Sequence, residues 1–494
     1  MTGPRELWTG IRDRARVLRS IDRWLLGALI VGLAARIGWQ LYVDAQPTSD
    51  ALVYFDHAER LANGLGYVFD GRPTAYIPVG YPATLAAFFE VFGVHVWVGK
   101  LVNILAFIAI VSLTYLIGRE LYGRPAARIA AWIMALLPSQ VFVSTLLFSE
   151  PLFTAIQLAA VYLLLLGFRR APDASVARPG TAVSAATALF LLPELDKARL
   201  IAGACLVVLL GLAVYGWRRD RVLLLWGAAG VVTGYALLVR PAGLTIVLAA
   251  LVATYILARR MAPWHPGDAQ SLPGPRVSRS PVLKYGGVYL LGAALLVLPW
   301  LARNQAEIGI GANISTNGGL NVLVGNHDGA TGCFSFDDED RFLFLIADEV
   351  ERDRKALEES LEFTQEDPLQ ALSLLPLKFN CTWREDAISV YWNSFDQEDT
   401  PGRIPRAMFS FASNWAYYGL LFLAFLGIPA WWLRKPGHLL LPLLVGFTAI
   451  YYTLVLGDPR YHEPLLPFFA IWAACGILFV PRWLRSARER PADE

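Results

Sequence analysis

The feature that most constrains the fold is a series of mostly apolar runs, each long enough to cross a lipid bilayer. A hydrocarbon core about 30 Å thick needs about 20 helical residues. Such runs occupy residues 24–43, 95–117, 126–146, 150–168, 222–239, 242–258, 283–302, 414–433, 438–456 and 464–481. A weaker pair, 181–195 and 198–216, would place both termini on one side of the membrane. We therefore expect an all-α polytopic membrane protein with about 12 transmembrane helices, within a range of about 10 to 13.

The composition agrees with this class. Hydrophobic residues make up 55% of the chain and charged residues 17%, against about a quarter charged in a typical soluble domain. The net charge of +2 is an average over basic short loops and one long acidic segment. It therefore indicates no nucleic-acid partner, and the expected surroundings of the chain are membrane lipids.

The distribution of Lys and Arg predicts the orientation, because short cytoplasmic loops are rich in these residues. Basic residues occur in both terminal tails and at alternate crossings, as Arg169-Arg170, Arg218-Arg219, Arg259-Arg260 and Arg434-Lys435. We expect these segments, and both termini, to be cytoplasmic. The opposite, extracytoplasmic face then receives residues 44–94, the turns at Ser149-Glu150 and Arg240-Pro241, residues 303–412 and the turn Asp458–His462.

The same pattern predicts the organisation of the chain. We expect a cytoplasmic tail (1–23), an N-terminal transmembrane module (24–302), an acidic extracytoplasmic segment (303–412), C-terminal transmembrane helices (413–481) and a second cytoplasmic tail (482–494). Residues 261–282, rich in Pro, Ser and Gly, are typical of a linker.

Two of the outer segments are long enough to contain structure. In the first outer loop, 44–94, amphipathic patterns predict interfacial helices over Asp50–Leu61 and Tyr81–Phe92. In the acidic segment we expect a helix over Ile346–Phe363, and too little apolar surface for an independent domain. Cys333 and Cys381 both lie in this segment and could form a disulfide in an oxidising compartment.

Acidic residues at the outer membrane boundary are the main candidates for catalysis. Asp50 and Tyr54 are four residues apart and share one helical face, while Asp56 lies on another. We expect Asp50 to act as a general base, the alternative being a charge that stabilises a helix N-terminus. Glu150 opens an apolar helix beside Ser149 and Pro151, and either a functional or a capping role fits it.

Three arginines at outer helix ends are candidates for anion binding. Arg240 and Arg303 follow apolar helices, and Arg460 opens the return of the last hairpin. A guanidinium pairs with phosphate oxygens and stays charged when desolvated, so together these residues would suit a phosphate or a diphosphate. The alternative for each is a side chain that extends to the membrane interface.

A polar, glycine-rich loop from Asn313 to Gly329 follows Arg303. It could present amides and hydroxyls to a sugar, although turn formation alone also explains its Gly and Asn residues. His327 and His462 lack the spaced partners of a metal motif, so we expect no metal ligands there. No P-loop, dinucleotide-binding fingerprint or Gly-x-Ser-x-Gly elbow is present, which disfavours a nucleotide-driven pump and a serine hydrolase.

Several short motifs occur in a characteristic order. They are Asp50-x-x-x-Tyr54, Gly80-Tyr81-Pro82, Ser149-Glu150-Pro151, Arg240-Pro241, Pro299-Trp300-x-x-Arg303-Asn304, the glycine loop with Gly325-Asn326, and Arg460-Tyr461-His462. In order and sidedness the chain resembles the polytopic GT-C glycosyltransferases, especially the bacterial group related to protein O-mannosyltransferases and to the lipid A aminoarabinose transferase. The motifs extend from about residue 24 to residue 481.

The resemblance implies a sugar donor on a polyprenyl phosphate, inversion at the anomeric carbon, and a lipid, glycan or protein acceptor. It makes Asp50 the base and matches Glu150 to a second acidic position. The residues expected to bind substrate are Tyr54, Asp56, Arg72, Tyr81, Arg240, Arg303, Asn304, Asn326, Lys378, Arg460, Tyr461 and His462.

The chain also departs from the aminoarabinose transferases. These have basic residues at the positions of Val53 and Ile77. The phosphate clamp must then come from other residues, and the candidates are Arg72, Arg240, Arg303, Lys378 and Arg460.

The expected cofactor is none. A divalent metal such as Mg or Mn on Asp50, Asp56 and Glu150 is the alternative, but Asp56 faces away on a helix. Competing functions are a lipid or sugar transporter or flippase, and a ligase or polymerase with a lipid-diphosphate donor. A transporter would be expected to show internal repeats, and none is evident; the polar residues also cluster at helix ends.

Overall fold

The computed structural model describes residues 22–170, 220–260, 280–311, 313–335, 346–394, 405–431 and 436–488. The weaker predicted pair of spans, 181–195 and 198–216, lies outside these ranges, as do residues 1–21, residues 489–494 and most of the expected linker. Each of the ten stronger apolar runs contains a helix, although the run 126–146 is broken within its length. These helices are α2 (Arg23–Tyr42), α5 (Val96–Tyr122), α6 (Arg124–Leu136), α8 (Ser149–Arg170), α10 (Arg221–Val239), α11 (Leu244–Arg260), α12 (Ser280–Glu307), α18 (Arg406–Trp431), α19 (Leu440–Val455) and α20 (Leu466–Arg488).

The chain is therefore an all-α polytopic membrane protein, as predicted. Within the described ranges, eight helices are long and apolar enough to cross a membrane. A ninth span results if α6 is joined to α7 (Pro138–Phe142) and the short helix η1 (Val143–Thr145), which bend by 56° at a break. The short apolar stretch Pro241–Ile256, formed by η4 (Pro241–Gly243) and α11, follows α10. The predicted count of about 12 is not confirmed.

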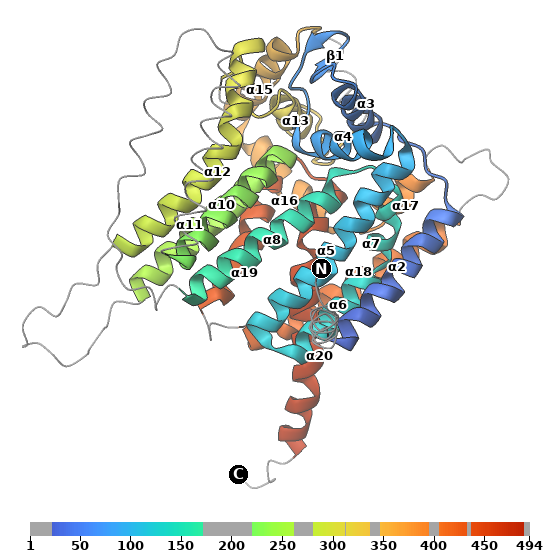
Figure 1. The fold of residues 1–494 in the computed structure, drawn as a ribbon, viewed down its shortest axis with the longest axis vertical. Coiled ribbons are helices and arrows are strands. Elements are labelled where there is room, and N and C mark those ends of the chain that lie inside the picture. Colours follow the sequence, from blue (N-terminus) through green and yellow to red (C-terminus); the bar gives the residue numbers. More distant parts are fainter. Residues whose placement is uncertain are drawn as a thin grey trace, which may run out of the picture.

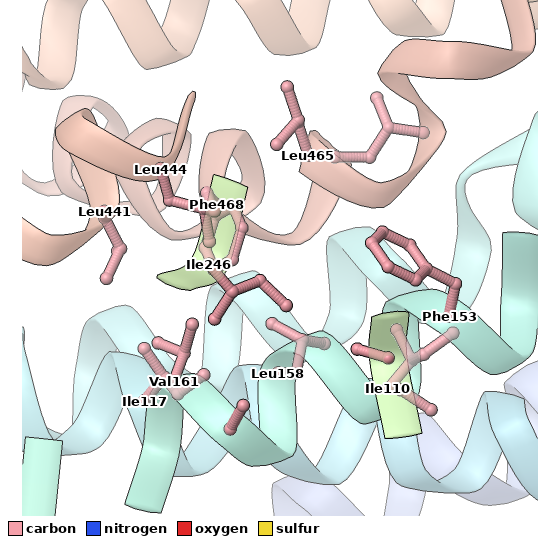
Figure 2. Close-up of a cluster of buried hydrophobic side chains, with 14 of the residues drawn as sticks. Ile110, Ile117, Phe153, Leu158, Val161, Ile246, Leu441, Leu444, Leu465 and Phe468 are labelled. Carbon is pink, nitrogen blue, oxygen red and sulfur yellow. The ribbon is translucent and has the colours of Figure 1, made fainter. Parts of the chain in front are cut away.

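Buried aliphatic side chains and close backbone contacts hold the bundle together. Figure 2 shows part of the core, in which Ile110 of α5, Leu158 and Val161 of α8, Ile246 of α11, Leu444 of α19 and Phe468 of α20 are buried. Between α10 and α12 the helices approach so closely that a Cβ on Gly230 would lie 2.0 Å from the Tyr289 carbonyl oxygen. Small residues at such crossings favour membrane helix packing, because they let dispersion contacts form along the backbone.

Two acidic N-caps fix one end of the bundle. Asp22 accepts a hydrogen bond from the Trp24 amide at the start of α2 and forms an ion pair with Arg128 of α6 at 2.8 Å. Asp220 caps α10 through the amides of Val222 and Leu223. Each carboxylate satisfies amides that the first helical turn leaves unpaired.

The short elements gather at the opposite end of the bundle. Helices α3 (Asp50–Ala62), α4 (Gly80–Phe92), α13 (Gly318–Gly325) and α15 (Glu349–Glu366), with the hairpin β1 (Val68–Phe69) and β2 (Arg72–Pro73), lie at the end remote from the C-terminal end of α20 (Figure 1). The acidic segment also contributes α16 (Pro368–Trp383) and α17 (Ile388–Asn393), and η6 (Pro459–Leu465) precedes α20.

The three short helices predicted from the sequence, now α3, α4 and α15, are confirmed. The hairpin, α16 and α17 were not predicted. The prediction of a loop throughout Asn313–Gly329 was wrong for its centre, which is helical as α13. The glycines there serve packing: a Cβ on Gly319 would lie 2.0 Å from the Asp353 carbonyl oxygen of α15. A disulfide joins Cys333 to Cys381, so the suggested pairing is confirmed.

Candidate functional site

A cavity of about 460 Å³ opens where the short elements meet the ends of the long helices. Its wall includes the start of α3, the α10–η4 turn, residues 313–322, α15, the end of α19 and the start of η6. Asp50, Arg240 and Arg460 supply charged groups to it, while Ser315, Asn317 and Asn321 supply hydroxyl and amide groups. The cavity therefore combines ionic groups with neutral hydrogen-bonding groups.

Asp50 and Arg460 meet in this cavity. Arg460 Nη1 lies 2.7 Å from Asp50 Oδ2, and the exposed fractions of the two side chains are 12% and 42%. Arg460 is positioned locally by Asp458, whose carboxylate accepts a hydrogen bond from the Arg460 amide at 2.8 Å and caps η6. A carboxylate from the first outer loop is thus paired with an arginine more than 400 residues later in the chain.

Glu150 and Arg240 form a second ion pair behind the first. Arg240 Nη1 lies 2.5 Å from Glu150 Oε1, and the Glu150 side chain is only 2% exposed. Arg240 Nη1 also donates a hydrogen bond to Ser149 Oγ at 3.1 Å, and the Tyr54 hydroxyl lies 3.4 Å from the same oxygen. Since Arg460 Nε is 3.9 Å from Glu150 Oε1, the two ion pairs form one network.

Burial and neighbouring charges shift the pKa values of residues in this network. Burial, followed by the charge of Asp50, raises the pKa of Tyr54 to about 12, so its hydroxyl remains protonated and can donate a hydrogen bond. Burial raises the pKa of Asp458, although the Arg460 guanidinium opposes this effect. Burial alone would lower the pKa of Arg240, but the Glu150 carboxylate outweighs it and the net direction is upward.

Several predicted residues lie close to this network. Asp50, Tyr54, Arg240, Arg460 and Tyr461 line the cavity. Glu150 does not line it, but contacts two arginines that do. The ring of Tyr81 packs edge-on against Tyr54, with 5.0 Å between ring centroids, and supports it from behind.

Arg303 and Asn304 hold loops together. The Arg303 guanidinium donates hydrogen bonds to the carbonyls of Thr74 at 2.6 Å and Tyr67 at 2.8 Å, in the first outer loop. Its Nε pairs with Glu307 at 2.7 Å, one turn further along α12. Asn304 donates a hydrogen bond to the Asn313 carbonyl at 3.0 Å. Neither residue lines the cavity.

Other predicted residues are buried elsewhere or exposed. Lys378 is fully buried and donates a hydrogen bond to Asn326 Oδ1 at 2.5 Å. His462 contacts the Thr382 carbonyl at 2.7 Å and Asp386 at 3.2 Å. Arg72 is exposed in β2, and neither it nor Asp56 is part of the cavity wall.

The sequence interpretation missed several cavity residues. Tyr452 lines the wall and stacks on Tyr461 at 4.1 Å between ring centroids. Tyr76 and Asp353 also line it. A tyrosine pair at the end of an apolar run, Tyr451-Tyr452, was an available signal, because aromatic rings gather at membrane interfaces. Asp353 carried no comparable signal in its strongly charged helix.

Among the described residues, no group of three or more His, Cys, Asp or Glu side chains is arranged to hold a metal ion. Asp50 and Glu150 instead direct oxygens to arginines. The arrangement in this structure therefore does not fit the alternative metal site on Asp50, Asp56 and Glu150, and metal-free catalysis stays a prediction.

Part of the chain is similar to a known family. A family model described as dolichyl-phosphate-mannose-protein mannosyltransferase matches residues 77–178, which include α4, α5 and Glu150. No curated protein matches the sequence.

Two solved structures cover most of the chain at low identity. The oligosaccharyltransferase AglB from Archaeoglobus fulgidus, in complex with an inhibitory peptide and a dolichol-phosphate, is 14% identical, with a TM-score of 0.44 over 95% of this chain and 52% of that chain. ArnT from Cupriavidus metallidurans bound to undecaprenyl phosphate is 12% identical, with a TM-score of 0.39 over 94% of this chain and 79% of that chain. The chain spans about half the length of AglB.

The family match lies in the part of the chain that carries Gly80-Tyr81-Pro82 and Ser149-Glu150-Pro151, two of the motifs on which the predicted resemblance depends. The chain is a multi-pass membrane protein whose residues 77–178 are similar to the protein mannosyltransferase family.

Proposed function

We propose that the cavity transfers a sugar from a polyprenyl-phosphate donor to an acceptor hydroxyl on the extracytoplasmic face, with inversion and with Asp50 as the general base. The observation that carries this proposal is the meeting of Asp50 with Arg460 and Arg240 in one cavity. The partly exposed Asp50 carboxylate is paired with the Arg460 guanidinium, and Arg240 lines the same cavity. The matching family's description names a dolichyl phosphate, which belongs to the polyprenyl phosphates.

The reaction needs a base on one side of the anomeric carbon and positive charge on the other. As the acceptor oxygen forms its bond to the anomeric carbon, Asp50 takes the hydroxyl proton. The bond between that carbon and the phosphate oxygen breaks, and its electron pair stays on the departing lipid phosphate. Arg240 and Arg460 stabilise this developing charge, because guanidiniums in a site of low dielectric interact strongly with phosphate.

The remaining residues position these groups. Glu150 and Ser149 fix Arg240, Asp458 fixes Arg460, and the protonated Tyr54 hydroxyl lies beside them. The boundary location suits a lipid donor, whose prenyl chain can stay in the hydrocarbon while its phosphate reaches the arginines. We place both termini in the cytoplasm, from the distribution of Lys and Arg.

The test is an Asp50→Asn variant, which preserves size but cannot accept the acceptor's proton. A deletion strain complemented with wild type should recover the missing sugar in its envelope glycans or glycoproteins by mass spectrometry, and Asp50→Asn should not. Asp70→Asn is the matched control, since Asp70 is exposed in the same outer loop and does not line the cavity. Full recovery by Asp50→Asn would remove Asp50 from the mechanism.

A further inference from the structure

The network around the two arginines contains more carboxylates than guanidiniums. Arg460 faces Asp50 at 2.7 Å, Asp458 at 3.6 Å and Glu150 at 3.9 Å, while Glu150 also pairs with Arg240. The buried Glu463 is a fourth acid in the same element as Arg460. A donor phosphate that enters this network meets arginines already paired with carboxylates. Repulsion between the phosphate and these carboxylates therefore disfavours its binding.

The carboxylates differ in how easily each can separate from its arginine. The side chains of Glu150 and Asp458 are 2% and 8% exposed, and Asp458 also caps η6 through the Arg460 amide. Separating a buried carboxylate from its guanidinium is costly, since it leaves a charge without water or partner. Asp50, with 42% of its side chain exposed, can be hydrated or bind another group when it leaves Arg460.

The carboxylate that pairs with Arg460 is also the group that the proposed chemistry needs. Asp50 Oδ2 accepts the Arg460 Nη1 hydrogen bond, while a general base must direct a lone pair at the acceptor hydroxyl. As long as the 2.7 Å contact persists, one oxygen of the carboxylate is occupied and the carboxylate stays directed toward Arg460.

We propose that the donor phosphate breaks the Asp50–Arg460 ion pair, which we call the latch. The phosphate takes the place of Asp50 on Arg460, and the released carboxylate then turns to the acceptor hydroxyl. This inference rests on the proposed function and adds an order to it: the base is freed only after the donor is bound. An acceptor that arrives first meets a carboxylate that is still directed toward Arg460.

The test measures binding of undecaprenyl phosphate to the full-length protein in detergent. If Asp50 competes with phosphate for Arg460, then Asp50→Asn and Asp50→Ala should each bind the lipid more tightly than wild type, by roughly fivefold or more. Asp70→Asn should bind with wild-type affinity. Two variants are used so that the result does not depend on one of them folding, which size-exclusion profiles and melting midpoints check.

The two proposals fail in different ways. Equal or weaker binding by folded Asp50 variants that have lost transfer would overturn the latch and leave Asp50 as the base. Retained transfer by these variants would overturn the proposed function, and the latch with it. Tighter binding combined with lost transfer is the result we expect.

Discussion

Arg240 Nη1 lies 2.5 Å from Glu150 Oε1 and joins the C-terminal end of α10 to the first turn of α8. Both charges also have the sign that the helix dipoles favour, a cation at a C-terminus and an anion at an N-terminus. Ser149, next to Glu150, accepts a hydrogen bond from the same Nη1. The pair therefore does more than cap one helix. It holds the Arg240 guanidinium in the cavity wall between the end of α10 and the start of α8.

We predict that Glu150→Gln lowers both stability and sugar transfer. The substitution leaves Arg240 buried without a countercharge, a change that typically costs about 3–5 kcal/mol. Transfer should fall roughly a hundredfold, because a displaced catalytic cation loses its alignment with the leaving group. Thermal unfolding in detergent and an initial-rate assay would measure the two effects.

The double variant Glu150→Leu with Arg240→Met separates the effect on stability from the effect on sugar transfer. Replacing both buried charges by apolar side chains of similar size should recover most of the stability, whereas transfer should stay low. If transfer recovered together with stability, the pair would be a packing element without a role in the reaction.

The helices could be predicted from the sequence, because hydrophobic run length acts locally, whereas their sidedness stays a prediction from the Lys/Arg bias. The shared face of Asp50 and Tyr54 was also predictable from a spacing of four, and both residues line the cavity. The partner of each arginine could not be predicted from the sequence. Arg240 and Arg303 both follow apolar runs, yet Arg240 ends α10, whereas α12 continues to Glu307 and directs Arg303 to the carbonyls of Tyr67 and Thr74. Such pairings are fixed by tertiary packing, which a residue type does not encode.

Arg303 provides the second prediction. The Arg303 guanidinium donates hydrogen bonds to two carbonyls of the first outer loop. Arg303→Lys keeps the charge, but the single ammonium group cannot reproduce both contacts. We expect faster limited proteolysis of residues 65–79 and a lower melting midpoint, with undecaprenyl phosphate affinity within about threefold of wild type. A large loss of lipid affinity with unchanged proteolysis would instead place Arg303 in the phosphate clamp.

The disulfide provides the third prediction. Cys333 and Cys381 lie at a junction where the Gly457 amide donates a hydrogen bond to the Gly332 carbonyl at 3.1 Å and the Phe334 amide donates one to the Gly457 carbonyl at 3.0 Å. Gly457 immediately precedes the turn that carries Arg460. Cys333→Ser with Cys381→Ser should therefore lower stability by about 2–4 kcal/mol and also reduce transfer.

Reduction of the wild-type protein should reproduce both effects, and the double serine variant should not respond to the reductant. The buried, free Cys475 is retained in both proteins, so any effect of the reductant through this thiol would appear in both. A reductant-sensitive loss of transfer in the serine variant would show that the disulfide is not the target.

The fourth prediction concerns the pH dependence of stability. Burial lowers the pKa of Lys378, which donates hydrogen bonds to Asn326 Oδ1 and the Leu454 carbonyl, from 10.5 to about 8. Between these two values the unfolded chain binds the lysine proton and the folded chain largely does not, so the free energy of unfolding rises with pH. Wild type should therefore gain stability relative to Lys378→Met between pH 8 and pH 10.5, with a constant difference below that window, in melting curves recorded across the range. Lys355→Met is the control, because Lys355 is 46% exposed and paired with Glu351. Parallel curves for wild type and Lys378→Met would mean that the Lys378 ammonium keeps its proton in the folded protein.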